Sequence, residues 1–355
     1  MVKVKAFGAK SASSLLSALE IDRRVPNPED VQIEILYCGV CHSDLHTARN
    51  EWKNTQYPSV TGHEIVGRVV AIGNKVKKFK VGDLAGVGCF IDSCGHCGSC
   101  KEHEEQYCEN GWTGTYNGPA FGGENTYGGY SKSIVVKESF VLKISHSEKE
   151  LPSVAPLLCA GITLYSPLKK WKVGSGQKVG IVGLGGLGHM GVKIANAMGA
   201  HVVLFTTSKN KIQDGLKLGA KEVCISTDET QMAKYQNQLD FIVNTVASPH
   251  KLDVYLNLLK KDSTMTLVGA PADPHPSIEV FSLIFKRRHL AGSLVGGIKE
   301  TQEMLDFCAK HKLVSDIEII KKVSIALSRK NFEEAITYAR ELKAKYKQEE
   351  NNQKS

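Results

Sequence analysis

Residues 179–188 read VGIVGLGGLG, in which four residues typical of a buried strand are followed by six that fit the pattern G-x-G-x-x-G. A helix-like stretch follows from about His189, so the glycines occupy a strand–turn–helix setting. In such a turn the first glycine, Gly183, permits the tight bend, and the second, Gly185, lets the backbone approach a pyrophosphate. The third, Gly188, lets helix and strand pack closely, and the helix N-terminus then faces the phosphates. The stretch therefore predicts a dinucleotide-binding unit.

The sequence around this unit has two parts of different character. From about residue 151, helix-like stretches alternate with short apolar runs, which are Val202–Phe205, Leu239–Val243 and Met265–Val268. Strands alternating with helices predict βαβ units and a parallel sheet. Residues 1–150 instead hold apolar runs separated by turn signals, such as Val31–Leu36 and Ile65–Ile72, and predict a β-rich region. A chain of 355 residues exceeds what one core usually serves, so two domains are expected.

The end of the strand Val202–Phe205 carries a second cofactor signal. Proteins that bind NAD place Asp or Glu here, about 20 residues after the glycine turn, to bind the ribose hydroxyls. This chain instead has the run Thr206-Thr207-Ser208-Lys209-Asn210-Lys211, which offers hydroxyl and ammonium groups and no carboxylate. The run favours a 2′-phosphate and hence NADP(H), although it also fits an ordinary turn and helix N-cap.

Composition and charge narrow the class of protein. The chain is 42% hydrophobic and 23% charged, as is usual for a globular protein. It has no apolar run of about 18 or more residues, so we expect no membrane partner. Its first seven residues, MVKVKAF, lack the apolar core of a secretory signal, so we expect a cytoplasmic protein. The net charge of +8 comes from scattered Lys and Arg residues, and we expect no nucleic-acid partner.

Ten cysteines in a chain expected to be cytoplasmic favour metal ligands over disulfides. Four of them, Cys94, Cys97, Cys100 and Cys108, form C-x2-C-x2-C-x7-C in a long stretch rich in glycine. Such spacings let four thiolates converge on one tetrahedral ion and close its coordination, so we predict a structural zinc. The reducing conditions expected in the cytoplasm disfavour a pair of disulfides, and an iron–sulfur cluster is the weaker alternative to zinc.

Three further positions carry metal-ligand chemistry but lie far apart in the sequence. They are Cys41, His63 in the triplet Gly62-His63-Glu64, and Cys159. A Cys/His/Cys set that leaves one position open is a known arrangement for a catalytic zinc. Taken singly, each residue fits a buried structural role equally well, and spacing alone does not join them. The remaining cysteines are interpreted as core or surface residues: Cys38, Cys89, Cys224 and Cys308.

Taken together, these motifs resemble the zinc-dependent medium-chain dehydrogenases, most closely the cinnamyl-alcohol-dehydrogenase-like group of NADP-dependent alcohol dehydrogenases. The resemblance runs from about residue 2 to about residue 340 and is dense in Cys41–His46, Gly62–Gly67 and the four-cysteine loop. It also includes 155–167, the glycine turn with its following helix, 265–271 and Gly292–Gly297. It breaks at the chain end, where 343–347 begin the family's usual last strand and a polar tail, expected to be disordered, follows.

The resemblance implies an α/β fold with a GroES-like β-rich catalytic domain and a Rossmann-fold dinucleotide-binding domain. The first would comprise residues 1–158 and 296–355, including the structural zinc loop 94–108, and the second residues 159–295. The family's dimers imply a homodimer paired around Phe281 to Gly296.

Motif positions also imply roles for individual residues. Cys41, His63 and Cys159 would bind the catalytic zinc, and Glu64 would be able to enter its coordination sphere. Ser43 and His46 would form the proton relay, with Glu64 as the third catalytic residue. Contacts to NADP(H) would come from Ser43, Thr163, Gly183, Leu184, Gly185, Gly186, Leu187, Gly188, Thr206, Thr207, Ser208, Lys211, Thr245, Gly269, Ser293, Leu294 and Val295.

The implied activity is hydride transfer between NADP(H) and a broad range of primary alcohols and aldehydes, including aromatic ones of the cinnamyl type. Zinc would stabilise the developing alkoxide, Ser43 would supply the proton and His46 would connect Ser43 to solvent. Trp112 and Tyr116 would either form an aromatic wall of the substrate pocket or only pack their loop. Two alternatives stay open: a polyol or aryl-alcohol oxidising dehydrogenase of the same superfamily, and a non-catalytic protein that binds zinc and NADP.

Overall fold

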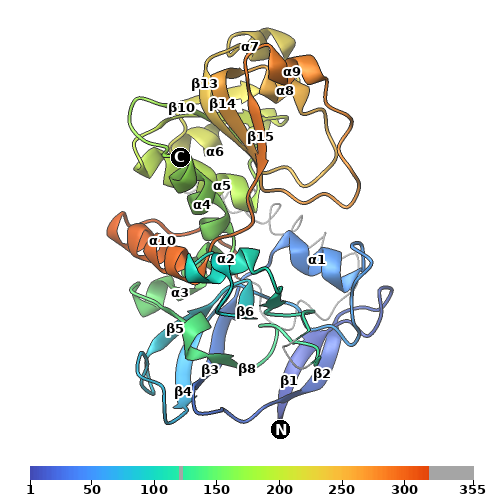
Figure 1. Cartoon of the computed structure of the whole chain (residues 1–355), viewed down its shortest axis with the longest axis vertical. Coiled ribbons are helices and arrows are strands. Elements are labelled where there is room, and N and C mark those ends of the chain that lie inside the picture. The colour runs from blue at the N-terminus through green and yellow to red at the C-terminus, as the bar shows by residue number, and fades with distance from the viewer. Residues whose placement is uncertain (120–122, 320–355) are drawn as a thin grey trace, which may run out of the picture.

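The computed structural model describes residues 1–119 and 123–319. Two sheet-based regions lie one above the other in Figure 1, and helices α4 (Ala160–Lys170) and α10 (Ile298–Lys310) lie between them. The arrangement confirms the α/β fold class. The last strand expected to begin at 343–347 and the polar tail expected after it lie outside the described residues.

A six-stranded parallel sheet forms the upper region, in the order β12-β11-β10-β13-β14-β15. Its strands are β10 (Lys178–Val182), β11 (His201–Thr206), β12 (Glu222–Ile225), β13 (Leu239–Asn244), β14 (Leu259–Leu267) and β15 (His289–Gly292). The helical segments joining them are α5 (Gly186–Ala197), η5 (Lys209–Lys211), α6 (Ile212–Lys217), α7 (Glu229–Ala233), α8 (Asp253–Leu256) and α9 (Val280–Ile284).

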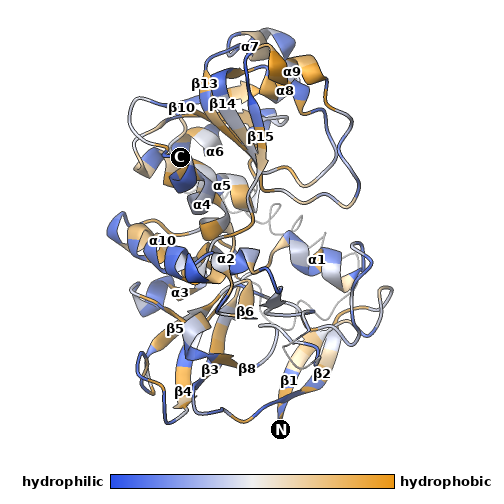
Figure 2. Ribbon diagram, in the orientation of Figure 1, coloured by the Kyte–Doolittle hydropathy of each residue, from blue (hydrophilic) through white to orange (hydrophobic). Residues whose placement is uncertain are grey.

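Successive side chains of a strand point to opposite faces of the sheet, and here both sets are apolar, which explains why both faces are covered. In β11, Val202 and Leu204 join the core cluster that contains α4 and α5. The intervening Val203 and Phe205 join the opposite cluster, which contains residues of α7 and α8. Figure 2 shows hydrophobic residues along several strands of this sheet.

An antiparallel sheet in the order β8-β3-β4-β5-β9 forms the lower region. Its strands are β3 (Asp30–Cys38), β4 (Ile65–Ile72), β5 (Leu84–Val87), β8 (Ser133–Lys137) and β9 (Leu142–Lys143), and the hairpin β1 (Val2–Gly8)–β2 (Ser17–Arg23) lies beside it. Helix α1 (His42–Ala48) follows β3, and the short turn η2 (Glu138–Phe140) follows β8. The strands predicted at Val31–Leu36 and Ile65–Ile72 correspond to β3 and β4.

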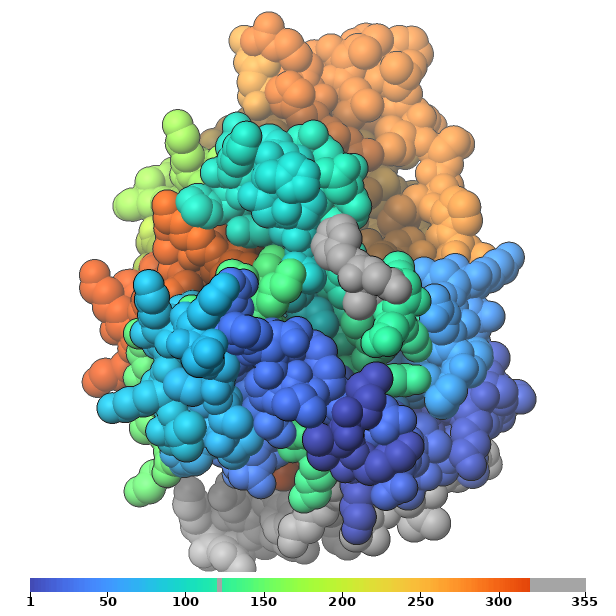
Figure 3. All heavy atoms as spheres, turned by 60° about the horizontal axis from the view of Figure 1, so that its bottom comes forward, coloured from blue at the N-terminus to red at the C-terminus, as the bar shows by residue number. Residues whose placement is uncertain are grey.

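The four cysteines lie in a separate lobe, residues 90–114, which we call the four-cysteine lobe. It contains β6 (Phe90–Ser93), α2 (Gly98–Lys101), η1 (Glu105–Tyr107) and β7 (Trp112–Gly114), with β6 and β7 paired antiparallel. Figure 3 shows the lobe as a turquoise projection next to orange-red residues from later in the chain.

Residues 151–168, whose apolar spacing is helical, do not form one continuous helix. After η3 (Glu148–Glu150) they form α3 (Leu151–Val154), η4 (Ala155–Leu158) and most of α4, with Cys159 at φ −128° and ψ −68° between the last two. No single helix among the described residues is long and apolar enough to cross a membrane, although one pair bent by 60°, Glu148–Leu158 with Ala160–Lys170, meets the length and composition requirement.

Candidate active site and cofactor edge

Four predicted ligands from three separate segments converge. One ligand atom each from Cys41, His63, Glu64 and Cys159 lies within 4.8 Å of all the others. Cys41 is the N-cap of α1, and its Sγ lies 3.8 Å from Sγ of Cys159. His63 and Glu64 immediately precede β4. The irregular backbone at Cys159 turns its thiol out of the helix line and into this group.

Asp44 ties two of these segments together. Its carboxylate accepts hydrogen bonds from the backbone N–H of Cys41 and of Gly62, each at 2.9 Å, and from the hydroxyl of Tyr130 at 2.8 Å. Asp44 is only 2% exposed, and burial raises the pKa of its carboxyl. Three donors to one buried carboxylate therefore hold the Cys41 and His63 backbones in a fixed relation.

The donor atoms of this group fit a zinc ion. Nε2 of His63 and Oε2 of Glu64 are buried with no hydrogen-bond partner among the residues that the structure describes. Two thiols, an imidazole nitrogen and a carboxylate are the ligands that zinc takes in proteins. Gly39 makes room for the carboxylate, because a Cβ there would lie 1.8 Å from Oε2 of Glu64.

The two thiols of the group differ in the direction of their pKa shifts. The pKa of Cys41 is well below its usual value, first because Cys159 hydrogen-bonds to it, while the pKa of Cys159 is raised by the same contact. Burial raises the pKa of Glu64. Cys89, interpreted above as an ordinary cysteine, also lies here: its hydrogen bond with Cys159 lowers its pKa to about 6.

Ser43 and His46, the predicted proton relay, extend the site along α1. Oγ of Ser43 lies 3.4 Å from Sγ of Cys41. His46 is 5% exposed, and its ring stacks on Trp52 with centroids 4.8 Å apart. Its Nδ1 pairs with the carboxylate of Glu51. Sequence reasoning missed Glu51 and Trp52, because they follow α1 at a spacing that marks no motif.

The two aromatic residues proposed for the pocket have different surroundings. The Tyr116 ring stacks on His63 at a centroid distance of 5.4 Å, and its hydroxyl lies 3.2 Å from Nδ1 of His63. Trp112 packs on Phe90 instead, at 5.9 Å, and is 38% exposed. Tyr116 is therefore a neighbour of the ligand group, whereas Trp112 packs within the four-cysteine lobe.

The glycine turn has the geometry that a dinucleotide requires. Gly183 has φ +92°, a conformation that favours glycine. A Cβ on Gly188 would lie 2.0 Å from the carbonyl oxygen of Gly183, whereas a Cβ on Gly185 or Gly186 would meet nothing within 4 Å. The turn is therefore closely packed on its inner side and open where a pyrophosphate would lie. The helix begins at Gly186, within the motif, rather than at His189.

The run 206–211 lies next to this turn. Nζ of Lys211 donates to the carbonyl oxygen of Leu184 at 2.9 Å, so an ammonium group lies at the glycine turn. Thr206 is buried and its Oγ1 accepts from N–H of Ser208 at 3.2 Å, whereas Thr207 is exposed. Hydroxyl and ammonium groups thus gather at the carboxyl end of β11.

The remaining predicted cofactor residues follow the carboxyl ends of other strands, except Ser43, which lies in α1, and Thr163, which is buried in α4 near Cys159. Thr245 follows β13, but its hydroxyl donates to the carbonyl oxygen of Val182 at 2.7 Å, which supports the turn. Gly269 follows β14, and a Cβ there would lie 2.5 Å from the carbonyl oxygen of Val246. Ser293, Leu294 and Val295 follow β15. Parallel strands with these residues at their carboxyl edge form the usual dinucleotide crevice.

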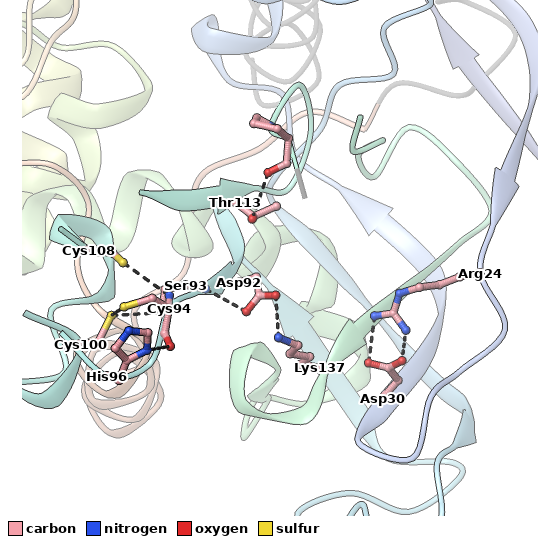
Figure 4. Close-up of polar contacts among 11 residues, drawn as sticks. Arg24, Asp30, Asp92, Ser93, Cys94, His96, Cys100, Cys108, Thr113 and Lys137 are labelled. Carbon is pink, nitrogen blue, oxygen red and sulfur yellow. Dashed lines mark hydrogen bonds and ion pairs between the residues drawn. The ribbon is translucent and has the colours of Figure 1, made fainter. Parts of the chain in front are cut away.

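The second set of ligands is the four-cysteine lobe. Its four Sγ atoms lie within 4.8 Å of one another, with Cys94 and Cys100 at 3.9 Å and Cys97 and Cys108 at 3.9 Å. Figure 4 shows three of the four, Cys94, Cys100 and Cys108. The backbone N–H groups of Cys94 and Cys97 donate to sulfur atoms of the set at 3.5 and 3.4 Å. Four thiols with donors to sulfur fit a closed, structural zinc site.

Comparison with known proteins identifies the family of the chain. The family models described as alcohol dehydrogenase GroES-like domain and zinc-binding dehydrogenase match residues 27–146 and 186–310. The chain is 60% identical over 321 residues to aldehyde reductase YahK of Escherichia coli, across 90% of this chain and 92% of that protein. A cinnamyl alcohol dehydrogenase of Sorghum bicolor matches with TM-score 0.88 and 40% identity, across 91% of this chain and 92% of that one. A cinnamyl alcohol dehydrogenase of Helicobacter pylori, complexed with NADP(H), matches with TM-score 0.84 and 45% identity, across 90% of this chain and 91% of that one. The chain therefore belongs to the zinc-dependent medium-chain alcohol dehydrogenases, in their cinnamyl-alcohol-dehydrogenase-like group.

Proposed function

We propose that the chain is an NADPH-dependent aldehyde reductase that accepts a broad range of primary aldehydes, including aromatic ones, and oxidises the corresponding alcohols. The observation that carries this proposal is the buried group of Cys41, His63, Glu64 and Cys159. Its fit to zinc supports a Lewis-acid site, and the hydroxyl and ammonium groups of 206–211 support a 2′-phosphate. The likeness to an aldehyde reductase and to an NADP(H)-complexed cinnamyl alcohol dehydrogenase supports the substrate class.

We assign Cys41, His63 and Cys159 to the catalytic zinc, with Glu64 as a further ligand, and the four cysteines of the lobe to a structural zinc. NADP(H) is assigned to the glycine turn, to 206–211 and to the strand-end residues described above. The proposed domain division places 159–295 in the Rossmann domain and the flanking segments in the catalytic domain.

When bound, zinc polarises the carbonyl oxygen of the aldehyde and NADPH supplies the hydride. The chain itself supplies the proton. Ser43 lies beside the ligand group, so its hydroxyl releases a proton to the product oxygen. The Glu51 carboxylate pairs with Nδ1 of His46 and so orients the ring, and we assign His46 as the group of the relay that follows Ser43 on α1.

The test is an NADPH-oxidation screen over aliphatic and aromatic aldehydes, with zinc content measured on the same sample. We expect turnover with two zinc ions per chain. Cys159→Ser abolishes turnover and leaves NADPH binding intact, while the control Cys224→Ser, a buried cysteine of the parallel sheet, keeps its activity. Normal turnover in a zinc-depleted Cys159→Ser sample would overturn the proposal. Oxidation of polyols without aldehyde reduction would favour the polyol dehydrogenase instead.

We also propose that the chain forms a homodimer through the outer edge of the parallel sheet. Four apolar side chains of α9 and its C-cap are more than half exposed: Val280, Phe281, Ile284 and Phe285. They lie near β15, the edge strand of the sheet, and Figure 2 shows α9 as a hydrophobic helix at the rim. Exposed apolar patches of this kind commonly mark contacts between proteins.

A cytoplasmic location is proposed as well, because both zinc sites need reduced thiols. All ten cysteines fall within the described residues, and each is a free thiol there. Recovery of the protein in a membrane or secreted fraction would contradict the location.

A further inference from the structure

Residues 293–298, which we call the crossing segment, carry the chain from β15 back to α10. Val295 and Ile298 pack against two core clusters, one built on the parallel sheet and one on the antiparallel sheet. The segment also includes three residues assigned above to NADP(H), namely Ser293, Leu294 and Val295. Its conformation therefore bears on both the junction of the two regions and the cofactor edge.

Val295 has an unusual backbone. Its φ is +36°, in the left-handed region, which a β-branched residue rarely adopts. Strained residues of this kind persist only where their surroundings hold them in place. The contacts that hold the crossing segment are therefore part of what shapes the cofactor edge.

The four-cysteine lobe supplies contacts on both sides of Val295. The hydroxyl oxygen of Tyr107 accepts from N–H of Leu294 at 3.1 Å. Oε2 of Glu105 accepts from N–H of Ile298, the first residue of α10, at 3.0 Å. The lobe is also in close backbone contact, since a Cβ on Gly297 would lie 1.8 Å from the carbonyl oxygen of His103.

Glu105 replaces a cap that α10 lacks. The N-cap residue of α10 is Gly297, which has no side chain to accept from the first N–H groups of this helix of 13 residues. A carboxylate from another segment satisfies one of these donors and interacts favourably with the helix dipole. The start of α10, and with it the end of the crossing segment, is therefore fixed by the lobe. Figure 1 shows α2 of the lobe next to α10.

We propose that the four-cysteine lobe sets the affinity for NADP(H), with Glu105 and Tyr107 acting as positioning residues for the crossing segment. The inference rests on the NADP(H) site of the proposed function. The structural zinc would then also influence the affinity for NADP(H), because the ion would order the loop that carries Glu105 and Tyr107.

The experiment titrates NADPH by fluorescence into the full-length protein with both zinc ions bound. The test variant is Glu105→Ala combined with Tyr107→Phe. We expect its Kd for NADPH to rise about 3- to 10-fold, the range for losing hydrogen bonds of this kind. The KM for NADPH should rise in parallel, whereas kcat at saturating NADPH and zinc content stay unchanged.

Two further variants separate positioning from general damage to the lobe. Glu109→Ala removes a carboxylate that accepts from Ser99 within the lobe, so the Kd for NADPH should not move. Glu105→Gln keeps an acceptor and should bind NADPH nearly as the wild type does. An unchanged Kd in the double variant, or an equal rise in Glu109→Ala, would overturn the inference. Failure of the wild type itself to bind NADPH would instead overturn the proposed function, and this inference with it.

Discussion

His63 presents two ring nitrogens with different surroundings. Nδ1 lies 3.2 Å from the Tyr116 hydroxyl, whereas Nε2 is buried with no partner among the described residues. If Nε2 binds zinc, Nδ1 carries the proton and donates to the oxygen of Tyr116. Partners of this kind fix the tautomer and orientation of a histidine ligand.

We therefore expect Tyr116→Phe to weaken zinc binding at the catalytic site about tenfold, the lower end of the range for such partners. Competition with a chromogenic chelator measures the affinity of each site. The structural site should be unaffected, and so should both sites in Trp112→Phe, since Trp112 packs on Phe90. Equal zinc affinity in Tyr116→Phe and the wild type would assign Tyr116 to the pocket wall alone.

Thr207 offers a test of the cofactor preference. Its side chain is exposed at the end of β11, so the fold tolerates a change there. A carboxylate at this position repels a 2′-phosphate and accepts from ribose hydroxyls. We expect Thr207→Asp to lower the ratio of kcat/KM for NADPH over NADH by about tenfold or more. Thr207→Ser, which keeps the hydroxyl, serves as the control, and an unmoved ratio in Thr207→Asp would remove 206–211 from the 2′-phosphate site.

Single residues show where sequence reasoning reaches its limit. Cys94, Cys97, Cys100 and Cys108 are predictable from spacing, because one loop carries all four. Cys41 and Cys159 are 118 positions apart and meet only through the tertiary fold, so the family resemblance had to join them. Asp44 and Glu51 could not be predicted, because Asp44 accepts from a backbone N–H across the fold and Glu51 lies beyond the end of the helix that carries its partner, His46.

At the scale of elements, two glycines of the glycine turn, Gly185 and Gly188, are expected to respond differently to substitution by alanine. A Cβ on Gly188 would meet the Gly183 carbonyl at 2.0 Å, whereas one on Gly185 would point into open space. Gly188→Ala should therefore lower the melting temperature, by about 2–4 °C for each kcal/mol of strain. Gly185→Ala should keep the melting temperature and weaken NADPH binding, because the methyl group lies where the backbone approaches the pyrophosphate. Differential scanning fluorimetry and NADPH titration separate the two, and a Gly185→Ala variant that binds normally would place the pyrophosphate elsewhere.

Element types were more predictable than element ends. Four of the parallel strands, β10, β11, β13 and β14, and also β4 follow apolar runs that the sequence marks clearly, whereas β12 and β15 were not predicted from such runs. The α/β class and the family are confirmed. The break at Cys159 was not predicted, because the apolar spacing of 151–168 continues through it. Pro156 lies just before the break and lacks the N–H that would continue the helical hydrogen bonding.

At the scale of the whole molecule, the exposed apolar residues of α9 test the proposed dimer. The Phe281 and Phe285 rings stack at 4.9 Å, and Phe285 is 74% exposed. Charged side chains at these two positions should dissociate a dimer without changing either group of zinc ligands. We expect Phe281→Lys with Phe285→Lys to sediment as a monomer, while Val81→Lys, at another exposed apolar position, stays dimeric. A wild-type monomer, or a dimeric double variant, would exclude this edge as the interface.

The stability of the whole fold in acid depends partly on its buried histidines, whose contribution to the free energy of unfolding falls as the pH falls. Burial lowers the pKa of His146 and of His189 below the usual value of 6.5. The folded chain therefore keeps both rings neutral at a pH where the unfolded chain already protonates them. Because the unfolded state binds more protons, the stability that these residues contribute is present above pH 6.5 and is lost as the pH falls below it.

His146 isolates this effect from the zinc sites, which also lose metal in acid as their ligands are protonated. It is 7% exposed, lies between β9 and η3, and belongs to neither ligand group. We expect the melting temperature of the wild type to fall more than that of His146→Gln between about pH 7.5 and about pH 5.5, since the variant has no ring to protonate on unfolding. Zinc loss acts equally on both proteins and cancels in the difference. Parallel curves would show that His146 titrates alike in the folded and unfolded chain, and that burial at this junction of β9 and η3 does not keep the ring neutral.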